Sequence, residues 1–309
     1  MNNTGNINNS GQVLQTWLYR QVLKNFEPKL RFYDMGQKPV YQDGYQTLAW
    51  TRVNRLEVTP ASALLNQGIT PVETNINLDT ITLVPKQYGM YVTMSDYLLD
   101  VAPINLTKEA TVQVGNNMAR ILDNVIQSNL ATNGTNVIYG GTAGNRAAIG
   151  AGDVATASNF AQANAFLQTK GAPEFDSGYV GVIHPNVVYD LQMESGTGAF
   201  VDVNKYSKPD AVMSGEIGKM FGVRLVTSGY IQTFASSVTV YPTYILGQGA
   251  YGVATLQTLQ AYITPRMASD SDPLAQRVKV WSKLAFDSII LQQKALVRLE
   301  TASALSYAW

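Results

Sequence analysis

The sequence has no cysteine and only one histidine among its 309 residues. The lack of cysteine excludes a disulfide and a cysteine-based metal site. The single histidine, His184, follows an apolar stretch and precedes Pro185, where the chain is expected to turn. A lone histidine can act as a general base, but no Gly-x-Ser-x-Gly motif supplies a nucleophile for it. We therefore expect His184 to cap a helix or hold a turn, and we predict no catalytic residue.

Charged residues are also few, at 14% of the chain against about 25% in an average globular protein. The formal net charge is zero, which gives no reason to expect nucleic acid or an anionic membrane as a partner. Two explanations fit a surface with so little charge. It is either buried against other subunits or covered by the many Asn, Gln, Ser and Thr residues.

Long apolar runs are missing as well. No window reaches 18 consecutive apolar residues, so the sequence predicts no membrane span. Residues 1–11 have neither the basic region nor the apolar region of a signal peptide. We expect a protein that does not enter a membrane.

Two short motifs resemble ligand sites without meeting their requirements. Residues 247–252 read Gly-Gln-Gly-Ala-Tyr-Gly, which matches the Gly-x-Gly-x-x-Gly pattern of dinucleotide-binding loops. Such a loop must open a helix, whereas residues 253–259 favour a strand. Asp270 and Asp272 could together hold a cation weakly. We expect a turn between two strands at the first motif and a polar turn at the second, with no cofactor and no metal ion.

The most prominent feature that is present is a long helical pattern over residues 107–130. Asn105 or Thr107 can cap its start, and Asn133-Gly134 can end it. At 1.5 Å per residue this helix is roughly 36 Å long, about twice the average. Its apolar residues follow at spacings of three and four, as on one face of an amphipathic helix: Ala110, Val114, Met118, Ile121, Leu122, Val125, Ile126 and Leu130.

The segments before this helix favour β-strands, over residues 46–56 and 76–94. The connection over residues 57–73 is too long for a hairpin turn, and it is too apolar for a solvated loop. It is either a binding tip or a loop folded back on its own core. Candidates for contacts with other subunits are Leu64, Leu65, Gly68, Ile69, Pro71 and Val72, together with Trp17 and Leu18 in a short helix predicted over residues 12–26.

Helices and strands mix in the middle of the chain, which suggests an α/β subdomain. The predicted helices cover residues 158–170, 185–193 and 209–221, and the predicted strands cover 179–183, 223–227 and 237–241. Gly, Thr, Ala and Asn dominate residues 133–153, where we expect a surface loop. Residues 276–299 are predicted to form one long extended segment, with an apolar face made by Val278, Val280, Leu284 and Phe286.

Several motifs occur in an order that is similar to a family of tailed-bacteriophage major capsid proteins, the branch first described from a short-tailed coliphage. The resemblance covers residues 40–130 and 240–300. The motifs are Gly44-Tyr-Gln-Thr, Leu65-Asn-Gln-Gly-Ile-Thr-Pro71, Gln87-Tyr-Gly-Met-Tyr-Val-Thr-Met-Ser-Asp96, Met118-Ala-Arg-Ile-Leu-Asp123, Asp272-Pro-Leu-Ala-Gln-Arg277, Trp281 and Lys283. One position departs from the family pattern, since Gln67 stands where an acidic residue is usual.

The resemblance implies an α+β fold of the Hong Kong phage type, with four parts. Residues 1–44 would form an N-terminal arm, and residues 45–93 an extended two-stranded loop. Residues 94–150 and 253–309 would form a peripheral domain with a spine helix over residues 107–130. Residues 151–252 would form an axial α/β domain.

The function that the resemblance implies is that of a major capsid protein, located in the virion and assembled in the host cytoplasm. It would self-assemble into pentamers and hexamers of an icosahedral head that encloses double-stranded DNA. Its partners would be further copies of the chain, with portal, scaffolding and decoration proteins as additional candidates and non-specific contact to DNA on the inner face. The residues leave two alternatives: another virion component, such as a tail or neck protein, and a nucleotide-binding enzyme that uses residues 247–252 and His184.

Overall fold

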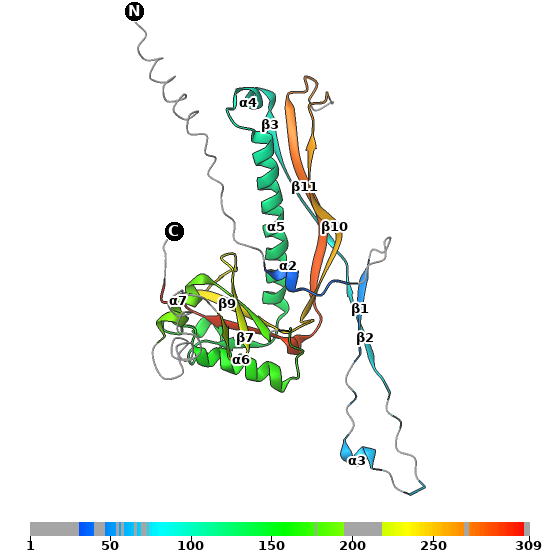
Figure 1. Cartoon of the computed structure of the whole chain (residues 1–309), viewed down its shortest axis with the longest axis vertical. Coiled ribbons are helices and arrows are strands. Elements are labelled where there is room, and N and C mark those ends of the chain that lie inside the picture. The colour runs from blue at the N-terminus through cyan, green and yellow to red at the C-terminus, as the bar shows by residue number, and fades with distance from the viewer. Residues whose placement is uncertain are drawn as a thin grey trace, which may run out of the picture.

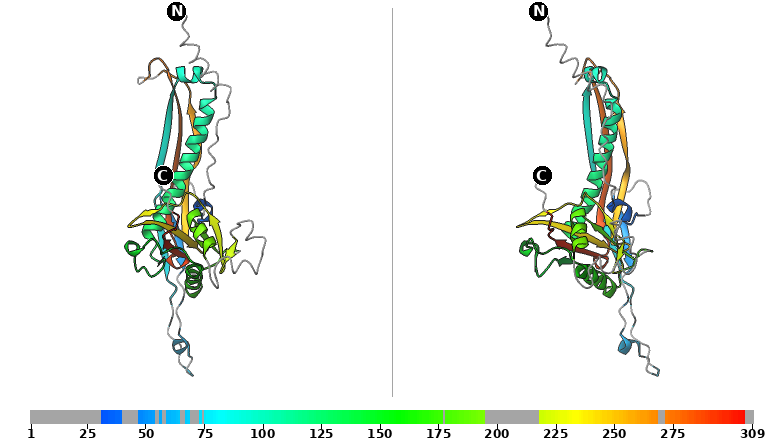
Figure 2. Two further views of the ribbon diagram at one scale, coloured as in Figure 1. Left: turned by 90° about the vertical axis from the view of Figure 1, so that its left-hand side faces the viewer. Right: turned by 60° about the vertical axis from the view of Figure 1, so that its left-hand side comes forward.

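The computed structural model describes residues 31–39, 47–53, 56, 59–64, 67–68, 73, 75–176, 178–194, 218–268 and 272–305. Within these residues the molecule is elongated (Figure 1). A long helix runs beside long strands, and a more compact body of strands and short helices surrounds the C-terminal end of that helix. A two-stranded hairpin projects in the opposite direction from the long strands. The two turned views in Figure 2 keep the helix and the long strands side by side.

The long helix is α5 (Leu106–Asn133), with 28 residues. It begins where the Asn105 side chain accepts a hydrogen bond from the Lys108 backbone N–H at 3.0 Å. It ends at Gly134, whose N–H donates to the carbonyl oxygen of Leu130. The predicted helix over residues 107–130 is confirmed and extended by one residue at its start and three at its end. The apolar stripe faces inward, with Val114, Met118, Leu122, Ile126 and Leu130 buried.

The strands beside α5 form an antiparallel sheet in the order β10 (Tyr251–Thr264), β11 (Arg277–Ile290) and β3 (Lys86–Ser95), which we call the long sheet. Its alternating residues divide between two faces, as expected for strands. Val278, Val280 and Leu284 of β11 are buried on the face that packs on α5. The apolar face predicted for this segment is therefore confirmed.

The projecting element pairs β1 (Leu48–Val53) with β2 (Leu78–Leu83) and is called the hairpin here. The two strands are antiparallel, with Leu48 opposite Leu83 and Val53 opposite Leu78. The short helix α3 (Pro60–Ala63) lies between them in the chain, far out on the projection (Figure 1). At the other end of the molecule, α4 (Asp96–Val101) follows β3 and begins at Ser95, whose Oγ accepts from the Leu98 N–H.

The compact body is built on a second sheet, the mixed sheet, in which parallel and antiparallel pairs both occur. The helices α6 (Ala157–Thr169) and α7 (Pro185–Met193) accompany it, and their buried residues share one large core with α5. The order of its strands is β4 (Val137–Tyr139), β12 (Leu296–Thr301), β9 (Thr239–Leu246), β5 (Tyr179–Ile183), β7 (Val223–Thr227) and β6 (Lys219–Met220), with β8 (Phe234–Ala235) paired to β9. Strands from the ranges expected for the peripheral and axial domains therefore share one sheet.

An N-terminal segment crosses the subunit where the helix, the long sheet and the body meet. Its helix α2 (Phe32–Met35) packs on α5, and Phe32 is fully buried. Gln37 then joins the edge of β10, since its N–H donates to the Tyr251 carbonyl at 2.9 Å and its carbonyl accepts from the Val253 N–H at 3.0 Å. The predicted helix over residues 12–26 lies outside the described residues.

Most of the elements predicted in the middle of the chain are confirmed. The predicted helices over 158–170 and 185–193 correspond to α6 and α7, and the predicted strands over 179–183 and 223–227 correspond to β5 and β7. The strand predicted over 237–241 is the start of β9, which continues to Leu246. These elements are short, and glycine or proline next to them in the sequence marks where several of them begin or end.

Three predictions were wrong in part. The extended segment over 276–299 breaks after β11, where a 3₁₀ turn (Gln293–Ala295) leads into β12 of the other sheet. The loop over 133–153 contains β4, which pairs in parallel with β12, and a 3₁₀ turn (Arg146–Ala148). The helix over 209–221 lies mostly outside the described residues, but its end is the strand β6, because Phe221 and Gly222 both adopt positive φ and turn the chain back into β7.

Candidate assembly surfaces

The hairpin is anchored at its root by a small apolar cluster. Leu48 and Leu83 are buried together with Ala254 of β10, and the partly buried Trp50 and Ile289 pack against them. Trp50 also lies against Gly252, which has no side chain to displace it. These contacts fix the start of the hairpin on the long sheet.

Just beyond this cluster, Arg52 makes polar contacts with the turn after β11 and with β2. Its Nη1 donates to the carbonyl oxygen of Leu291 at 3.0 Å, and its Nη2 lies 2.8 Å from Asp79 Oδ2. Both side chains of the ion pair are more than 40% exposed, so the pair contributes at most about 1 kcal/mol. A hollow of about 450 Å³ lies beside this point, between the hairpin and the turn after β11. The root of the hairpin is therefore held on the long sheet.

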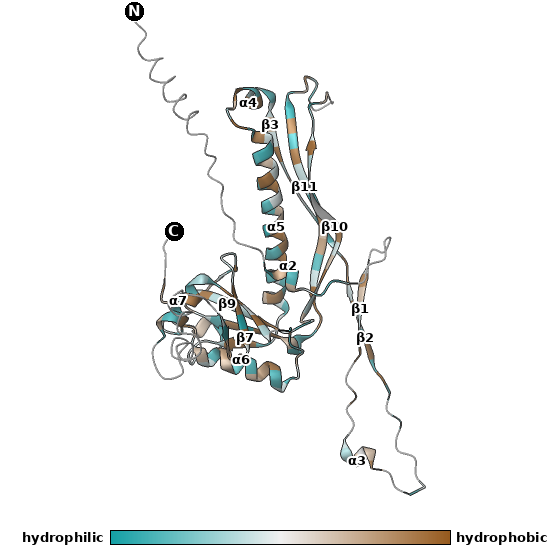
Figure 3. Ribbon diagram, in the orientation of Figure 1, coloured by the Kyte–Doolittle hydropathy of each residue, from teal (hydrophilic) through white to brown (hydrophobic). Residues whose placement is uncertain are grey.

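Beyond the root, the hairpin exposes large apolar side chains. Val53, Ile76 and Leu78 are each more than 60% exposed, and Leu56 is also exposed. Figure 3 shows apolar residues along the projecting strands. A two-stranded hairpin is at best marginally stable alone in water, and clustered apolar exposure usually marks a contact site. This part of the subunit has the properties of a surface that another molecule covers.

The residues predicted for inter-subunit contact fall on the same projection where the structure describes them. Leu64, directly after α3, is 68% exposed. Gly68 has a φ of +79°, a conformation that favours glycine, and an added Cβ there would meet no atom within 4 Å. Leu65, Ile69, Pro71 and Val72 lie outside the described residues, as do Trp17 and Leu18.

A second candidate surface is the face of the long sheet that points away from α5. Tyr262, Trp281 and Tyr91 stand opposite one another on its three strands and form a row across it. The rings of Tyr262 and Trp281 stack with centroids 4.6 Å apart, and Trp281 Nε1 donates to Thr264 Oγ1 at 2.9 Å. Tyr91 is 70% exposed, so the row is open to solvent within the described part of the chain.

Two lysines flank this aromatic row on β11. Lys279 and Lys283 precede and follow Trp281 at alternate positions, so both lie on its face of the sheet. Next to Lys283, Gly89 leaves a shallow hollow of about 340 Å³, which Tyr91 and Trp281 also line. The sequence does not reveal the aromatic row, because its members come together only through strand register.

A third surface is the apolar tip around α4, at the end of the long sheet far from the body (Figure 1). Tyr97 and Val101 of α4, Leu274 and Met267 are each more than 60% exposed. The ion pair between Arg266 and Asp100 lies here too, with its charged atoms 3.0 Å apart. Apolar side chains are therefore exposed at both ends of the elongated subunit.

A buried carboxylate holds the N-terminal segment on α5. Asp123 Oδ1 accepts a hydrogen bond from the Phe32 N–H at 3.0 Å, and the Tyr251 hydroxyl donates to the Phe32 carbonyl. Burial raises the pKa of the Asp123 carboxyl, although hydrogen bonds from the backbone of Arg31, Phe32 and Tyr33 act in the other direction. The N-terminal segment is thus hydrogen-bonded to the middle of α5 through Asp123.

The residues considered for chemistry have structural roles. His184 is the N-cap of α7, and its Nδ1 accepts from the Asn186 N–H at 3.1 Å. Burial lowers the pKa of this imidazole, which favours the neutral form that can accept the bond. The expected capping role is confirmed.

The glycine motif and the described part of the acidic pair also have structural roles. Residues 247–250 join β9 to β10, and the motif opens no helix, as predicted. Asp272 accepts from the backbone N–H groups of Gln276 and Arg277, which confirms a polar turn, while Asp270 lies outside the described residues. Among the described side chains, no group of three or more His, Asp or Glu residues could hold a metal ion. No helix in this part of the chain combines the length and hydropathy needed to cross a membrane.

The sequence and the fold were compared with known proteins. The family model described as phage capsid protein matches residues 79–299, more than half of the chain. None of the curated proteins matches the sequence. The structure is similar to that of the cyanophage P-SCSP1u capsid, with a TM-score of 0.71 at 17% identity and 92% of each chain covered. For the capsid of Ralstonia phage GP4 the TM-score is 0.69 at 12% identity, covering 94% of this chain and 97% of that one.

A third similar structure, from the capsid of cyanophage Pam1, has a TM-score of 0.69 at 15% identity and covers 88% of this chain and 89% of that one. These likenesses confirm the α+β fold of the Hong Kong phage type, including the long spine helix. The family match decides against the enzyme and the tail or neck alternatives. The chain belongs to the phage capsid protein family, as the major capsid protein of a tailed phage and a structural subunit of its icosahedral head.

Proposed function

We propose that the subunit builds its shell from pentamers and hexamers in which the hairpin of each copy lies on the long sheet of a neighbour. The observation that carries this proposal is the hairpin itself, which is anchored at one end and exposes Val53, Ile76 and Leu78 beyond the anchor. A contact of this kind is heterologous, since two different surfaces meet, and such contacts close into rings. Many weak contacts per subunit then stabilise a shell through multivalency.

The receiving surface in this proposal is the aromatic row with its flanking lysines. Tyr91, Trp281 and Tyr262 offer apolar area to the apolar side chains of the projection. The charges are complementary as well, because Glu57 and Glu73 are the charged residues of the segment over 56–77, whereas Lys279 and Lys283 flank the row. Complementary charges favour one docking register over others.

Each of the four expected parts of the chain has its own role in this proposal. Residues 1–44 act as an arm whose base is tied to α5 at Asp123, and residues 45–93 act as the reaching loop. Residues 94–150 and 253–309 form the peripheral domain, and residues 151–252 form the axial domain. The mixed sheet joins the last two where β12 pairs with β9, so they would move as one body rather than as linked domains.

The finer assignments rest on the sequence resemblance. We place the chain in the branch first described from a short-tailed coliphage. We also propose that it encloses double-stranded DNA, with non-specific contact at the inner face, and that portal, scaffolding and decoration proteins are its further partners. The formal net charge of zero supports weak contact with DNA, because a strongly basic inner face would hold the packaged molecule tightly.

The experiment that tests the docking contact removes each side of it in turn. Deletion of residues 57–76 should leave a subunit with normal circular dichroism that forms no closed shells by electron microscopy. Tyr91→Ser should give the same result from the receiving side, because it removes exposed apolar area without touching the core. Tyr189→Ser on α7, also a partly exposed tyrosine, is the matched control and should assemble normally. Normal shells from the deletion variant would refute the proposal.

A further inference from the structure

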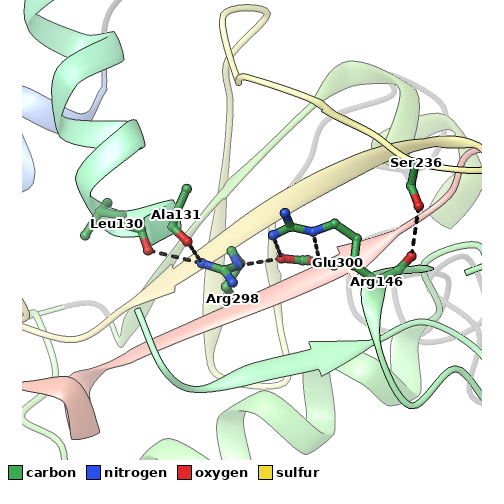
Figure 4. Close-up of polar contacts among 6 residues, drawn as sticks. All are labelled: Leu130, Ala131, Arg146, Ser236, Arg298 and Glu300. Carbon is green, nitrogen blue, oxygen red and sulfur yellow. Dashed lines mark hydrogen bonds and ion pairs between the residues drawn. The ribbon is translucent and has the colours of Figure 1, made fainter. Parts of the chain in front are cut away.

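Three charged side chains meet where the end of α5 reaches the mixed sheet, two of them buried and the third, Arg146, partly exposed (Figure 4). Arg298 and Glu300 are two residues apart on β12 and therefore point to the same face of the sheet. Arg146 comes from the 3₁₀ turn after β4. Glu300 is fully buried and Arg298 is 6% exposed. Charged residues are rarely this buried unless they are paired.

Arg298 connects the helix to the sheet. Its Nη1 donates to the carbonyl oxygens of Leu130 at 3.2 Å and Ala131 at 2.5 Å, which belong to the last turn of α5. Its Nε donates to Glu300 Oε1 at 2.7 Å. The carbonyl oxygens at a helix C-terminus carry a partial negative charge, so they favour a cation. One planar group is thus bonded to the end of the helix and to a side chain of the strand.

Glu300 is held from the opposite side by a second arginine. Arg146 donates from Nε to Glu300 Oε2 at 2.7 Å and from Nη2 to Oε1 at 2.6 Å, a bidentate arrangement. The guanidinium carbon of Arg146 lies 3.8 Å from the centre of the Phe234 ring, and the Ser236 hydroxyl donates to the Arg146 carbonyl at 3.4 Å. Phe234 belongs to β8, and Ser236 lies in the turn between β8 and β9. The contacts of Arg146 therefore reach from the turn after β4 to β8.

Stability alone does not account for this arrangement. Burying charges carries a desolvation cost, and well-packed apolar residues in the same space are often equally stable or more so. Apolar packing is non-directional, however, whereas the bonds of Arg298 define where the helix end must lie. What the ionic contacts add is a defined angle between α5 and the mixed sheet.

That angle matters because α5 is long, so a small change of angle at one end displaces the other end by several ångströms. The helix is about 42 Å long at 1.5 Å per residue, so a tilt of about 5° at its C-terminal end displaces its other end by about 4 Å. The apolar tip and the long sheet move with it, since both pack along α5. Such a shift exceeds what a packed interface tolerates, and it would change how neighbouring copies meet.

We propose that Arg298 is a positioning residue for shell assembly, which bonds the end of α5 to Glu300 and so sets the angle between the long helix and the mixed sheet. The inference rests on the assembly of the chain into a shell, but it concerns the geometry of the single subunit. It therefore has a test that does not depend on assembly.

The first test measures the angle in dispersed subunits of the full chain. Because the sequence has no cysteine, spin labels can be attached at Lys108→Cys near the start of α5 and at Gln168→Cys on α6. Both positions are exposed, and α6 packs on β12. Adding Arg298→Met should broaden the distribution of label distances by about 4 Å. Arg298→Lys keeps the charge but loses the planar fork, and should broaden it less.

Leu299→Ala is the matched control, because Leu299 is a fully buried neighbour on the opposite face of the same strand. It should lower the melting temperature while leaving the label distances narrow. The proposal fails if Arg298→Met leaves the distribution unchanged, or if Leu299→Ala broadens it as much. If Arg298→Met does not fold, an unchanged distribution for Arg298→Lys overturns the proposal in the same way.

The second test examines shells by electron microscopy. The unchanged chain and Leu299→Ala should form closed shells of one diameter, whereas Arg298→Met should form shells of mixed diameter or open sheets. Uniform shells from Arg298→Met would overturn the proposal. A failure of the unchanged chain to form shells would refute the proposed assembly instead, and the label distances would still decide whether Arg298 sets the angle.

Discussion

The indole of Trp50 lies so close to the backbone of Gly252 that an added Cβ on the glycine would be 2.7 Å from Trp50 Cζ2. Trp50 belongs to the hairpin and Gly252 to the start of β10, next to the point where Gln37 joins that strand. The reaching hairpin, the long sheet and the base of the N-terminal arm therefore meet at one glycine. We expect this contact to set the direction in which the hairpin leaves the subunit.

The first prediction concerns this glycine. Gly252→Ala should destabilise the subunit by about 1–3 kcal/mol, because the Trp50 ring must move out of a packed position. It should also reduce the yield of shells more than the loss of stability explains, since the hairpin would point elsewhere. Urea unfolding and electron microscopy measure the two effects.

Gly115→Ala provides the control for the same substitution. Gly115 lies inside α5 with open space around it, so alanine should stabilise the helix by about 1 kcal/mol. Normal shell yield with Gly252→Ala would contradict the role given to the Trp50 contact.

The second prediction concerns the packed face of α5. Val114 is fully buried between the helix and the long sheet, so Val114→Asp places an unpaired charge in the core. The expected loss is about 3–5 kcal/mol, a large share of the stability of a typical domain, and the subunit should fail to fold. Val112→Asp, two residues earlier on the exposed side, should keep its helical circular dichroism. A folded, soluble Val114→Asp subunit would count against the observed packing.

The third prediction concerns the pH dependence of stability at Asp123. Burial raises the folded-state pKa of this carboxyl above the ordinary pKa of 3.8 that it has in the unfolded chain. Between these two pKa values, the folded state binds more protons than the unfolded state. The contribution of Asp123 to stability should therefore fall as the pH rises from 3.8 to the folded-state pKa, and stay constant above it.

Asp123→Asn isolates this contribution, because the amide stays neutral while its oxygen can still accept from the Phe32 N–H. Relative to this variant, the unchanged subunit should lose stability as the pH rises above the ordinary carboxyl pKa of about 4. Urea unfolding of dispersed subunits across that range measures the difference. A difference that stays constant, or that grows in favour of aspartate with rising pH, would be inconsistent with the buried carboxyl.

Local patterns in the sequence were enough to predict much of the fold. The spacing of apolar residues predicts α5, and Asn105 and Gly134 stand at its ends because capping depends only on neighbours in the chain. The alternation in β11 predicts which of its faces is buried. From its place before Pro185, His184 was expected to cap a helix or hold a turn, and it caps α7. Exposure at Leu64 and Gly68 also agrees with the expected projecting loop.

Contacts between distant segments could not be predicted in this way. Residues 137–139 were predicted to lie in a loop because Gly, Thr, Ala and Asn dominate the residues around them, and their partner β12 lies about 160 residues away. The break after β11 was missed because β12 has the same extended pattern but belongs to another sheet. The aromatic row depends on the register of three strands.

The sequence by itself determined the kind of each major element and its apolar face, because helix and strand periodicity are properties of adjacent residues. Only the tertiary structure decided how these elements are oriented. Arg146, Arg298 and Glu300 are ordinary charged residues in the sequence, and they bond to one another only where α5, the mixed sheet and a 3₁₀ turn converge. Hydrogen bonds between segments more than 150 residues apart depend on the positions of whole elements, which no local pattern specifies.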